Sequence, residues 1–170
     1  LSSLSEGIVG INIGKNKETL NDIDDYIYCL QELGPFAHYI TVNISSPNTE
    51  GLRDFHDQEK LIDLIIALNK IKKDKGSNIP LILKISPDIN NSHISEIADA
   101  AIKNNISAII LTNTTNSHRN NLISPLKKEK GGLSGDPLNQ ISNNMIKNFS
   151  KELNGKVPII GAGGVSSGKS

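Results

Sequence analysis

The sequence predicts an α/β protein with a parallel sheet, built either as a (β/α)8 barrel or as an open, doubly wound sheet. Five short apolar runs rich in Ile and Val recur along the 170 residues, separated by segments with helical periodicity. Continuous rather than alternating hydrophobicity is typical of strands that are covered on both faces. Alternation of strand and helix implies right-handed crossovers within one parallel sheet.

The five apolar runs are the expected strands. They are GIVGINI, YITVNI, PLILKI, SAIILT and VPIIG, at residues 7–13, 39–44, 80–85, 107–112 and 157–161. The intervening segments are the expected helices, because each has apolar residues on one face. The first three faces consist of Leu20, Ile23, Ile27 and Leu30, of Leu61, Leu64, Ile65, Leu68 and Ile71, and of Ile94, Ile97, Ala101 and Ile102.

The fourth expected helix runs from Leu138 to Leu153 and has recognisable signals at both ends. Asp136 is the predicted N-cap and Pro137 occupies the first helical position. Gly155 lies just beyond the predicted end of the helix, where glycine is common. These signals indicate where the fourth helix begins and ends, ahead of the fifth expected strand.

Composition favours a small-molecule partner over a nucleic acid. Lys and Arg together number 18, as do Asp and Glu, so the chain lacks the positive field that a polyanion requires. A hydrophobic content of 36% suits one soluble globular domain, and no run approaches the roughly 20 apolar residues of a membrane span. The single cysteine, Cys29, is expected to be a buried structural thiol.

Every predicted strand ends in polar or small residues. They are Asn12, Asn43, Lys84, the segment 112–114 and the segment 161–164. In a barrel the carboxyl ends of successive strands surround one opening, where the active sites of such enzymes lie. The pattern therefore favours a barrel with a ligand site at this end.

Two of these residues, Asn43 and Lys84, are costly to bury without a partner. Asn43 lies within a strand and needs hydrogen bonds at both ends of its amide, whereas the following SSPNT also suits a simple turn. Ser45 and Ser46 precede a proline, which can direct one hydroxyl inward. Lys84 requires an anion or a carbonyl, as a Schiff-base lysine, a cation beside an electron-rich ring or a salt-bridge partner. The four histidines are expected on the surface.

Two glycine-containing segments suggest phosphate sites. The long loop after Asn113 is expected to have a mobile tip at 127–130 and an ordered GGLSG at 131–135, whose amides could approach a phosphate. The final segment GGVSSGKS, Gly163 to Ser170, matches the consensus of a nucleotide-binding P-loop, with Lys169 in the position of its lysine. Both a strand-end phosphate site and a P-loop would fit this pattern.

Six motifs, in order, resemble the dihydroorotate dehydrogenase family of flavin enzymes. They are GINIGKN, VNISSPNT, LKISPD, LTNTT, GGLSG and IIGAGGVSSG. The resemblance implies a (β/α)8 TIM barrel with FMN at the carboxyl ends of its strands. Residues 1–170 would form a single partial FMN-binding domain, about strands three to seven. The first two strands, the eighth, and N-terminal helices that associate with the membrane would lie outside this segment.

The catalytic base expected from the resemblance is Ser46, which indicates the quinone-linked class 2, because class 1 has cysteine there. Oxidation of dihydroorotate to orotate in pyrimidine (UMP) biosynthesis is implied, with hydride transfer to FMN and electrons passing to a ubiquinone-type acceptor. Thr49 is a candidate for the proton path. The family implies association with the bacterial inner membrane, on its cytoplasmic side, or with the mitochondrial inner membrane.

Further site residues follow from the resemblance, and none of them is a metal ligand. FMN would contact Asn12, Asn43, Lys84, Thr112, Gly135 and Gly164, and the pyrimidine would contact Asn43, Asn48, Asn113 and Thr114. The segment alone is expected to be inactive, because an open barrel has two unpaired strand edges. Two alternatives remain: a P-loop nucleotide-binding protein that uses Gly163–Ser170, and a non-catalytic FMN-binding remnant.

Overall fold

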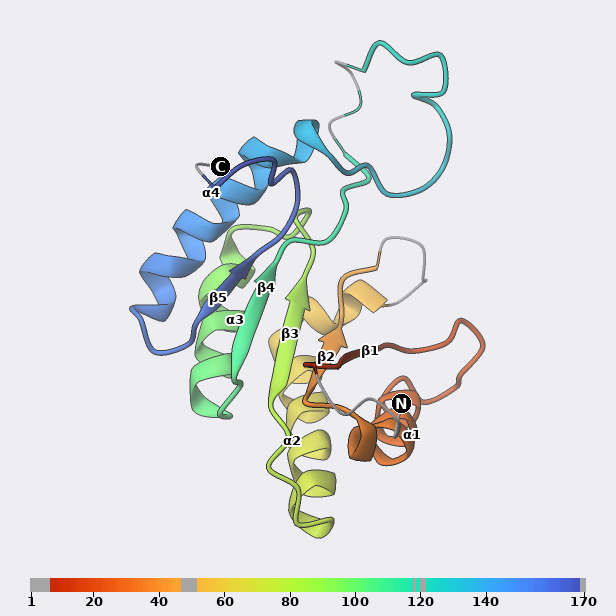
Figure 1. Cartoon of the computed structure of the whole chain (residues 1–170), viewed down its shortest axis with the longest axis vertical. Helices are drawn as coiled ribbons and strands as arrows, with labels where there is room; N and C mark the ends of the chain where they lie inside the picture. The colour runs from red at the N-terminus through yellow and green to blue at the C-terminus, as the bar shows by residue number, and fades with distance from the viewer. Residues whose placement is uncertain (1–6, 47–51, 118, 120–121, 169–170) are drawn as a thin grey trace.

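The computed structural model describes residues 7–46, 52–117, 119 and 122–168, and alternates strands with helices as the sequence predicts (Figure 1). The strands are β1 (Gly10–Ile13), β2 (Tyr39–Asn43), β3 (Leu81–Ile85), β4 (Ala108–Leu111) and β5 (Ile159–Gly161). The α-helices are α1 (Asp24–Leu33), α2 (Gln58–Asp74), α3 (Ser92–Lys103) and α4 (Asp136–Leu153), and two 3-10 helices are η1 (Gly34–Phe36) and η2 (Leu52–His56).

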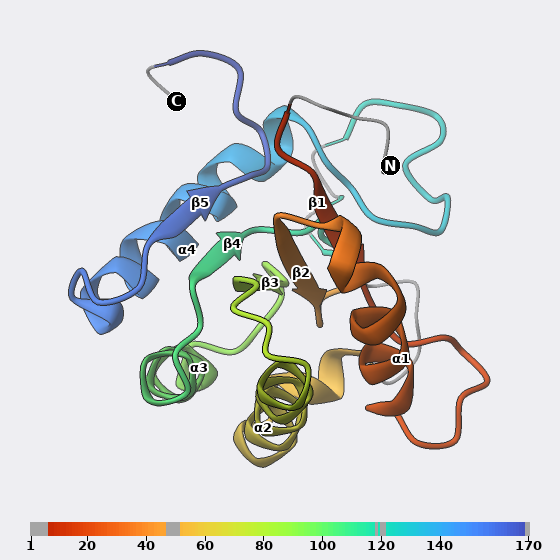
Figure 2. The same cartoon turned by 60° about the horizontal axis from the view of Figure 1, so that its bottom comes forward.

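The five strands form one parallel sheet in the order β1-β2-β3-β4-β5. A doubly wound sheet reverses its strand order at a switch point, and no reversal occurs here. Figure 2 shows the sheet curving, with the helices along its outer side. Consecutive parallel strands with helices on one side form part of a barrel wall, so the barrel alternative is the one observed.

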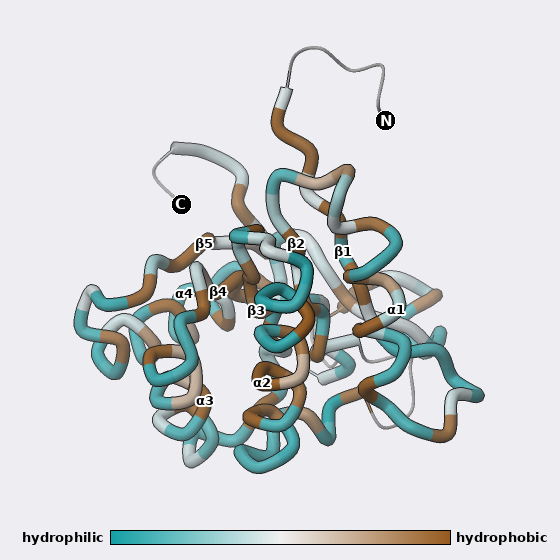
Figure 3. Tube along the Cα trace, turned by 90° about the horizontal axis from the view of Figure 1, so that it is seen from below, coloured by the Kyte–Doolittle hydropathy of each residue, from teal (hydrophilic) through white to brown (hydrophobic). Residues whose placement is uncertain are grey.

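The hydrophobic core lies between the outer face of the sheet and the helices. Val42 of β2, Leu83 of β3 and Leu111 of β4 have no exposed surface there. In Figure 3 the strands are mainly brown, while α2 and α3 alternate between brown and teal. This alternation is the amphipathic pattern that the sequence predicts.

Helices α2 and α3 confirm their predicted apolar faces. Leu61, Leu64, Ile65 and Leu68 of α2 are fully buried, and Ile94, Ile97 and Ala101 of α3 are at most 4% exposed. Helix α2 begins after Asp57, whose carboxylate accepts hydrogen bonds from the backbone of Glu59 and Lys60. Among the described helices, none is long and apolar enough to cross a membrane.

The predicted face of the first helix is partly wrong. Leu20 lies before α1 and is fully exposed, and the anchors of α1 are Tyr26 and Leu30. The segment before α1 forms a loop because ion pairing of Lys15 with Asp22 draws its two ends together. Because of this side-chain pairing, the helix begins later than the apolar spacing suggests, at Asp24.

Three further predictions need correction. The position before α4 is Gly135, and Asp136 is the first helical residue rather than the N-cap. Strand β1 starts at Gly10, because the Val9 amide donates to Nδ1 of His38 at 2.9 Å instead of to a strand carbonyl. Cys29 is half-buried rather than buried, although burial and then Asp25 raise the pKa of its thiol, as expected for an unreactive cysteine.

Candidate functional site at the carboxyl ends of the strands

Two layers of side chains occupy the inner face of the sheet. Asn43, Lys84 and Ile110 are in register on β2, β3 and β4. One layer nearer the strand starts, Asn12 of β1 is in register with Thr41. Because side chains alternate between the two faces, these residues point away from the helix-covered core. Asn43 and Lys84 are half-buried and Asn12 is exposed, so polar side chains line this inner face.

Two predicted amides meet at the ends of β2 and β4. Oδ1 of Asn43 accepts from the hydroxyl of Ser45 at 2.8 Å, and Nδ2 of Asn113 donates to that hydroxyl at 2.9 Å. Nδ2 of Asn113 also lies 3.4 Å from Oδ1 of Asn43. Oδ1 of Asn113 accepts from the backbone of Thr114 at 2.8 Å. Three predicted substrate residues therefore form one hydrogen-bonded group, with Ser45 as the bridge between its two amides.

The amide of Asn43 keeps an open donor. Within the part of the chain that the structure describes, Nδ2 of Asn43 makes no hydrogen bond, and Lys84 has no ion-pair partner. A salt bridge was one of the interactions expected for Lys84, and it is absent among these residues. Both groups are free to donate to a ligand that lies on the inner face.

Tyr26 of α1 contacts the end of β2 from the side of the sheet that the helices cover. Its hydroxyl donates to the Asn43 carbonyl at 2.8 Å, and its ring packs edge-on against Phe55 with centroids 5.6 Å apart. Burial, and then Asp22 and Asp25, raise the pKa of Tyr26 despite an opposing backbone hydrogen bond, so the phenol keeps its proton. An aromatic residue in an amphipathic helix is the one sequence signal that could have indicated this contact.

Ser46, the predicted catalytic base, is half-buried and directly follows Ser45, which has no exposed surface. Ser45 belongs to the hydrogen-bonded group with Asn43 and Asn113, so Ser46 stands one residue from it. The predicted Asn48 and Thr49 lie outside the described residues. Ser46 thus directly follows this hydrogen-bonded group in the chain, and its role as the base stays a prediction.

Thr112 lies at the junction of β4 and β5. Its backbone donates to the Ala162 carbonyl at 2.6 Å, and its side chain is 3% exposed. Its Oγ1 is buried without a hydrogen-bond partner among the described residues. An unsatisfied buried hydroxyl is unfavourable unless a ligand or water completes it. Thr112 is thus available to a bound group, and its contact with a flavin stays a prediction.

The predicted phosphate glycines meet at the start of α4. A Cβ on Gly164 would lie 2.6 Å from the Asn139 nitrogen, and φ at Gly164 is +73°. Nδ2 of Asn139 donates to the Gly164 carbonyl at 2.9 Å. Gly135 directly precedes α4 with φ at +82°. Gly135 therefore precedes the first turn of α4 and Gly164 packs against it, at a helix start where free N–H groups attract anions.

His56 corrects the expectation that the histidines lie on the surface. It is only 6% exposed, and its Nε2 has no partner among the described residues. Burial lowers the pKa of His56 to about 4, and the nearby Arg53 and His93 add to this shift. The ring is therefore neutral near pH 7. His118 lies outside the described residues.

Arg119 makes hydrogen bonds across the tip of the long loop between β4 and α4. Its guanidinium donates to the carbonyls of Glu129, at 2.8 Å, and of Gly131. Nearer the strand, Thr115 and Leu133 pair as an isolated antiparallel bridge. The GGLSG segment is thus attached beside β4, whereas mobility of the tip stays a prediction.

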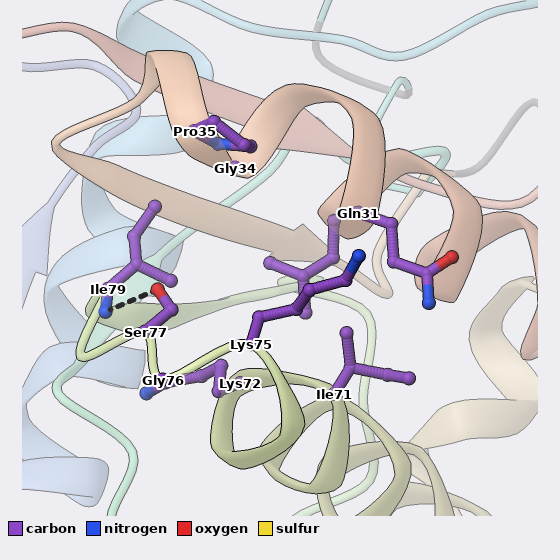
Figure 4. Close-up of a pocket in the computed structure, with 10 residues that line it drawn as sticks. Gln31, Gly34, Pro35, Ile71, Lys72, Lys75, Gly76, Ser77 and Ile79 are labelled. Atoms are coloured by element: carbon purple, nitrogen blue, oxygen red, sulfur yellow. Dashed lines mark hydrogen bonds between the residues drawn. The ribbon is translucent and has the colours of Figure 1, made fainter.

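A cavity of about 400 Å³ lies between the carboxyl-terminal ends of α1 and α2, away from the residues above (Figure 4). Its walls include Leu30, Pro35, Ile71 and Lys72. Because these residues precede β2 and β3, the cavity is at the end where strands begin. Barrel enzymes place their active sites at the opposite end, so we assign the site to the Asn43 and Asn113 group rather than to this cavity.

Comparison with known proteins agrees with this geometry. Residues 2–170 match a family model described as Dihydroorotate dehydrogenase. A dihydroorotate dehydrogenase (quinone) from Wigglesworthia glossinidia brevipalpis is 47% identical over 171 residues, which cover 97% of this chain and 51% of the relative. One from Escherichia fergusonii is 43% identical over 170 residues, with 95% of this chain and 50% of the relative covered.

Solved structures agree as well. A crystal structure of DHODH from Eimeria tenella in complex with ferulenol matches with a TM-score of 0.93 and 34% identity, covering 98% of this chain and 49% of that one. The ligand-free form from the same organism gives a TM-score of 0.89 at 35% identity, covering 96% of this chain and 50% of that one. The chain therefore spans about half the length of the relatives it matches.

Proposed function

Because this chain belongs to the dihydroorotate dehydrogenase family, we propose that the protein oxidises dihydroorotate to orotate in pyrimidine (UMP) biosynthesis and passes the electrons to a quinone. The observation that carries the proposal is the hydrogen-bonded group of Asn43, Ser45 and Asn113 beside Ser46. A P-loop function is not favoured by these relatives. Its Lys169 and Ser170 lie outside the described residues.

We assign FMN to the inner face of the sheet, within a single (β/α)8 barrel domain to which residues 1–170 belong. The fit rests on three observations: the open hydroxyl of Thr112, the unpaired Lys84 among the described residues, and the glycines at the start of α4. Asn12 and Asn43 would also contact the flavin, and Gly135 and Gly164 would donate to its phosphate. When bound, FMN accepts the hydride that the substrate loses.

The protein's own side chains would bind the substrate, remove its proton and supply positive charge. Asn43, Asn113 and Thr114, together with Asn48, would orient the pyrimidine through its carboxylate and ring amides. An analogue without those groups would leave buried amides unpaired, which gives selectivity. Ser46 Oγ would take the proton from carbon 5, and Lys84 would supply positive charge to the inner face. Thr49 would lie on the proton path.

The relatives' names indicate a quinone as the electron acceptor and state no location. A ubiquinone-type acceptor would require the protein to reach a membrane. We propose peripheral attachment through N-terminal helices, at the bacterial inner membrane on its cytoplasmic side or at the mitochondrial inner membrane. A vesicle-binding assay of the full-length protein, with and without those helices, tests this attachment.

The oxidation itself is tested by anaerobic spectroscopy of the full-length protein. It should be yellow and should bleach when dihydroorotate is added. Ser46→Ala should keep the colour and lose most turnover, because the flavin site is intact while the base is absent. Colour without bleaching in the wild type would favour a non-catalytic FMN-binding remnant. ATP binding without flavin would favour the P-loop, and an unchanged rate in Ser46→Ala would exclude Ser46 as the base.

A further inference from the structure

Asp88 lies where the loops that follow β2, β3 and β4 meet. It comes three residues after the end of β3, and its side chain is 10% exposed. Its backbone donates to Oγ of Ser86 at 3.1 Å, and Ser86 has no exposed surface. The backbone of Asp88 is therefore held next to the end of β3, and its carboxylate is largely withdrawn from water.

The carboxylate of Asp88 accepts bonds from two neighbouring loops. Oδ2 accepts from Nη2 of Arg53 at 3.0 Å and from the backbone of Asn116 at 3.0 Å. Oδ1 accepts from the hydroxyl of Thr115. We call these four residues the Asp88 cluster. Bonds of this kind to an ionised acceptor are about twice as strong as neutral ones.

Each partner of Asp88 belongs to a segment that carries a proposed site residue. Arg53 lies in η2, which follows Ser46 in the chain between β2 and α2. Thr115 directly follows Asn113 and Thr114, and it pairs with Leu133 through backbone bonds of 3.1 and 2.7 Å. A Cβ on Gly132 would collide with the Thr114 hydroxyl, so GGLSG is packed closely against this loop.

We propose that Asp88 is a positioning residue, which fixes the Ser46 loop and the Asn113–Thr114 loop relative to each other on the strand that carries Lys84. This inference rests on the proposed function, since those three segments would supply the base, the substrate amides and the cation. Asp88 contacts none of the reacting atoms. It acts through the placement of its neighbours, and small displacements of reacting groups are costly to rate.

The charge of Asp88 matters more than its shape. The backbone of Ser117 donates to Oγ1 of Thr115 at 2.9 Å, so the Thr115 hydrogen is directed to the carboxylate. All three partners of the carboxylate are therefore donors. An asparagine of the same size offers one acceptor oxygen and opposes at least one donor with its own NH2 group. Asp88→Asn should thus loosen one loop without removing volume.

The kinetic test compares Asp88→Asn, Arg53→Gln and the double variant in the full-length protein. The control is Asp99→Asn, which breaks an exposed pair with Lys103 of 3.1 Å on α3. We expect Asp88→Asn to retain flavin, while KM for dihydroorotate rises at least about tenfold. The double variant should lose little more than Asp88→Asn alone, because both changes break one contact. An unchanged KM in Asp88→Asn, or fully additive losses, would overturn the inference.

A second measurement tests the positioning role of Asp88 without any substrate. Hydrogen exchange of the free protein, followed in the peptide that covers 113–117, should be faster in Asp88→Asn than in Asp99→Asn, because either the Thr115 hydroxyl or the Asn116 amide loses its acceptor. Equal exchange in the two variants would refute the role of Asp88. If the wild type fails to bleach with dihydroorotate, the proposed function fails, while the exchange rates still test whether Asp88 holds these loops together.

Discussion

The two faces of the sheet differ although they alternate residue by residue along the same strands. On the outer face, Val42 and Leu83 are fully buried against the helices. On the inner face, their neighbours Asn43 and Lys84 are half-buried and keep open donors among the described residues. One backbone thus carries a close-packed core and a polar site, a single residue apart.

This difference indicates a division between stability and activity. Substitutions on the outer face should lower the free energy of unfolding and spare the chemistry of the protein that remains folded. Substitutions on the inner face should do the reverse, since its groups are not needed to fill the core. A variant that lowered the free energy of unfolding and the activity of the folded protein equally would contradict this division.

The largest effect is expected for Lys84→Met on the inner face. We predict that flavin reduction by dihydroorotate slows by about 10²- to 10³-fold, because a fixed cation is lost from a water-poor site. Tm should change little, since no ion pair of Lys84 is found in the described part of the chain. Stopped-flow spectroscopy and thermal unfolding of the full-length protein measure the two quantities. Lys103→Met, on the exposed side of α3, is the control and should retain its rate.

The adjacent change Leu83→Ala, on the outer face, should have the opposite profile. Removal of a fully buried leucine should lower the free energy of unfolding by about 3 kcal/mol, because it leaves a cavity between β3 and the helices. Urea denaturation measures this loss. Ile66→Ala, at a position of α2 that is 53% exposed, should cost less than about 0.5 kcal/mol. A slower flavin reduction in folded Leu83→Ala would contradict the separation of the two faces.

His56 lies beside the end of β2, where the two regions meet, and should make stability depend on pH. Its folded pKa of about 4 is below the ordinary value of 6.5, so the unfolded chain binds the proton more readily. Stability should therefore fall as the pH drops from 6.5 toward 4, by at most about 1.4 kcal/mol per pH unit, and this contribution should level off below that window.

Urea unfolding at several pH values tests the role of His56. His56→Gln, which does not titrate, should flatten the slope between pH 6.5 and 4. An equal slope in His56→Gln and in the wild type would assign the pH dependence to other groups.

The smallest effect is expected at the start of α2, on the outer side of the molecule. Asp57→Ala removes the acceptor for the Glu59 and Lys60 backbone groups and should cost about 1 kcal/mol. Flavin reduction should be unaffected. Asp63→Ala, an exposed position within the same helix, serves as the matched control and should stay within about 0.5 kcal/mol in urea titrations.

Much of the fold could be predicted because its signals are local. The apolar faces of α2 and α3 follow from helical spacing, and continuous runs such as that around Leu83 identify buried strands. Parallel strands bring their carboxyl ends to one edge, so Asn43 and Asn113 could be placed together before any coordinates were known. Family motifs added the expected roles of these residues.

The errors and omissions arise where distant residues pair. The Lys15 and Asp22 contact makes a loop of a segment whose apolar spacing suggests helix around Leu20. Tyr26 bonds a carbonyl 17 residues away, and Asp88 bonds Arg53, 35 residues away. Such partners are decided by tertiary packing, which no local pattern encodes.

The strand order has a consequence for how the chain acquires its structure. Every pairing in the sheet joins strands that are successive in the chain, from β1 to β5. Each new strand and its helix can therefore dock on a template that the ribosome has already released, without waiting for a later segment. The architecture permits assembly in the direction of synthesis, one unit at a time.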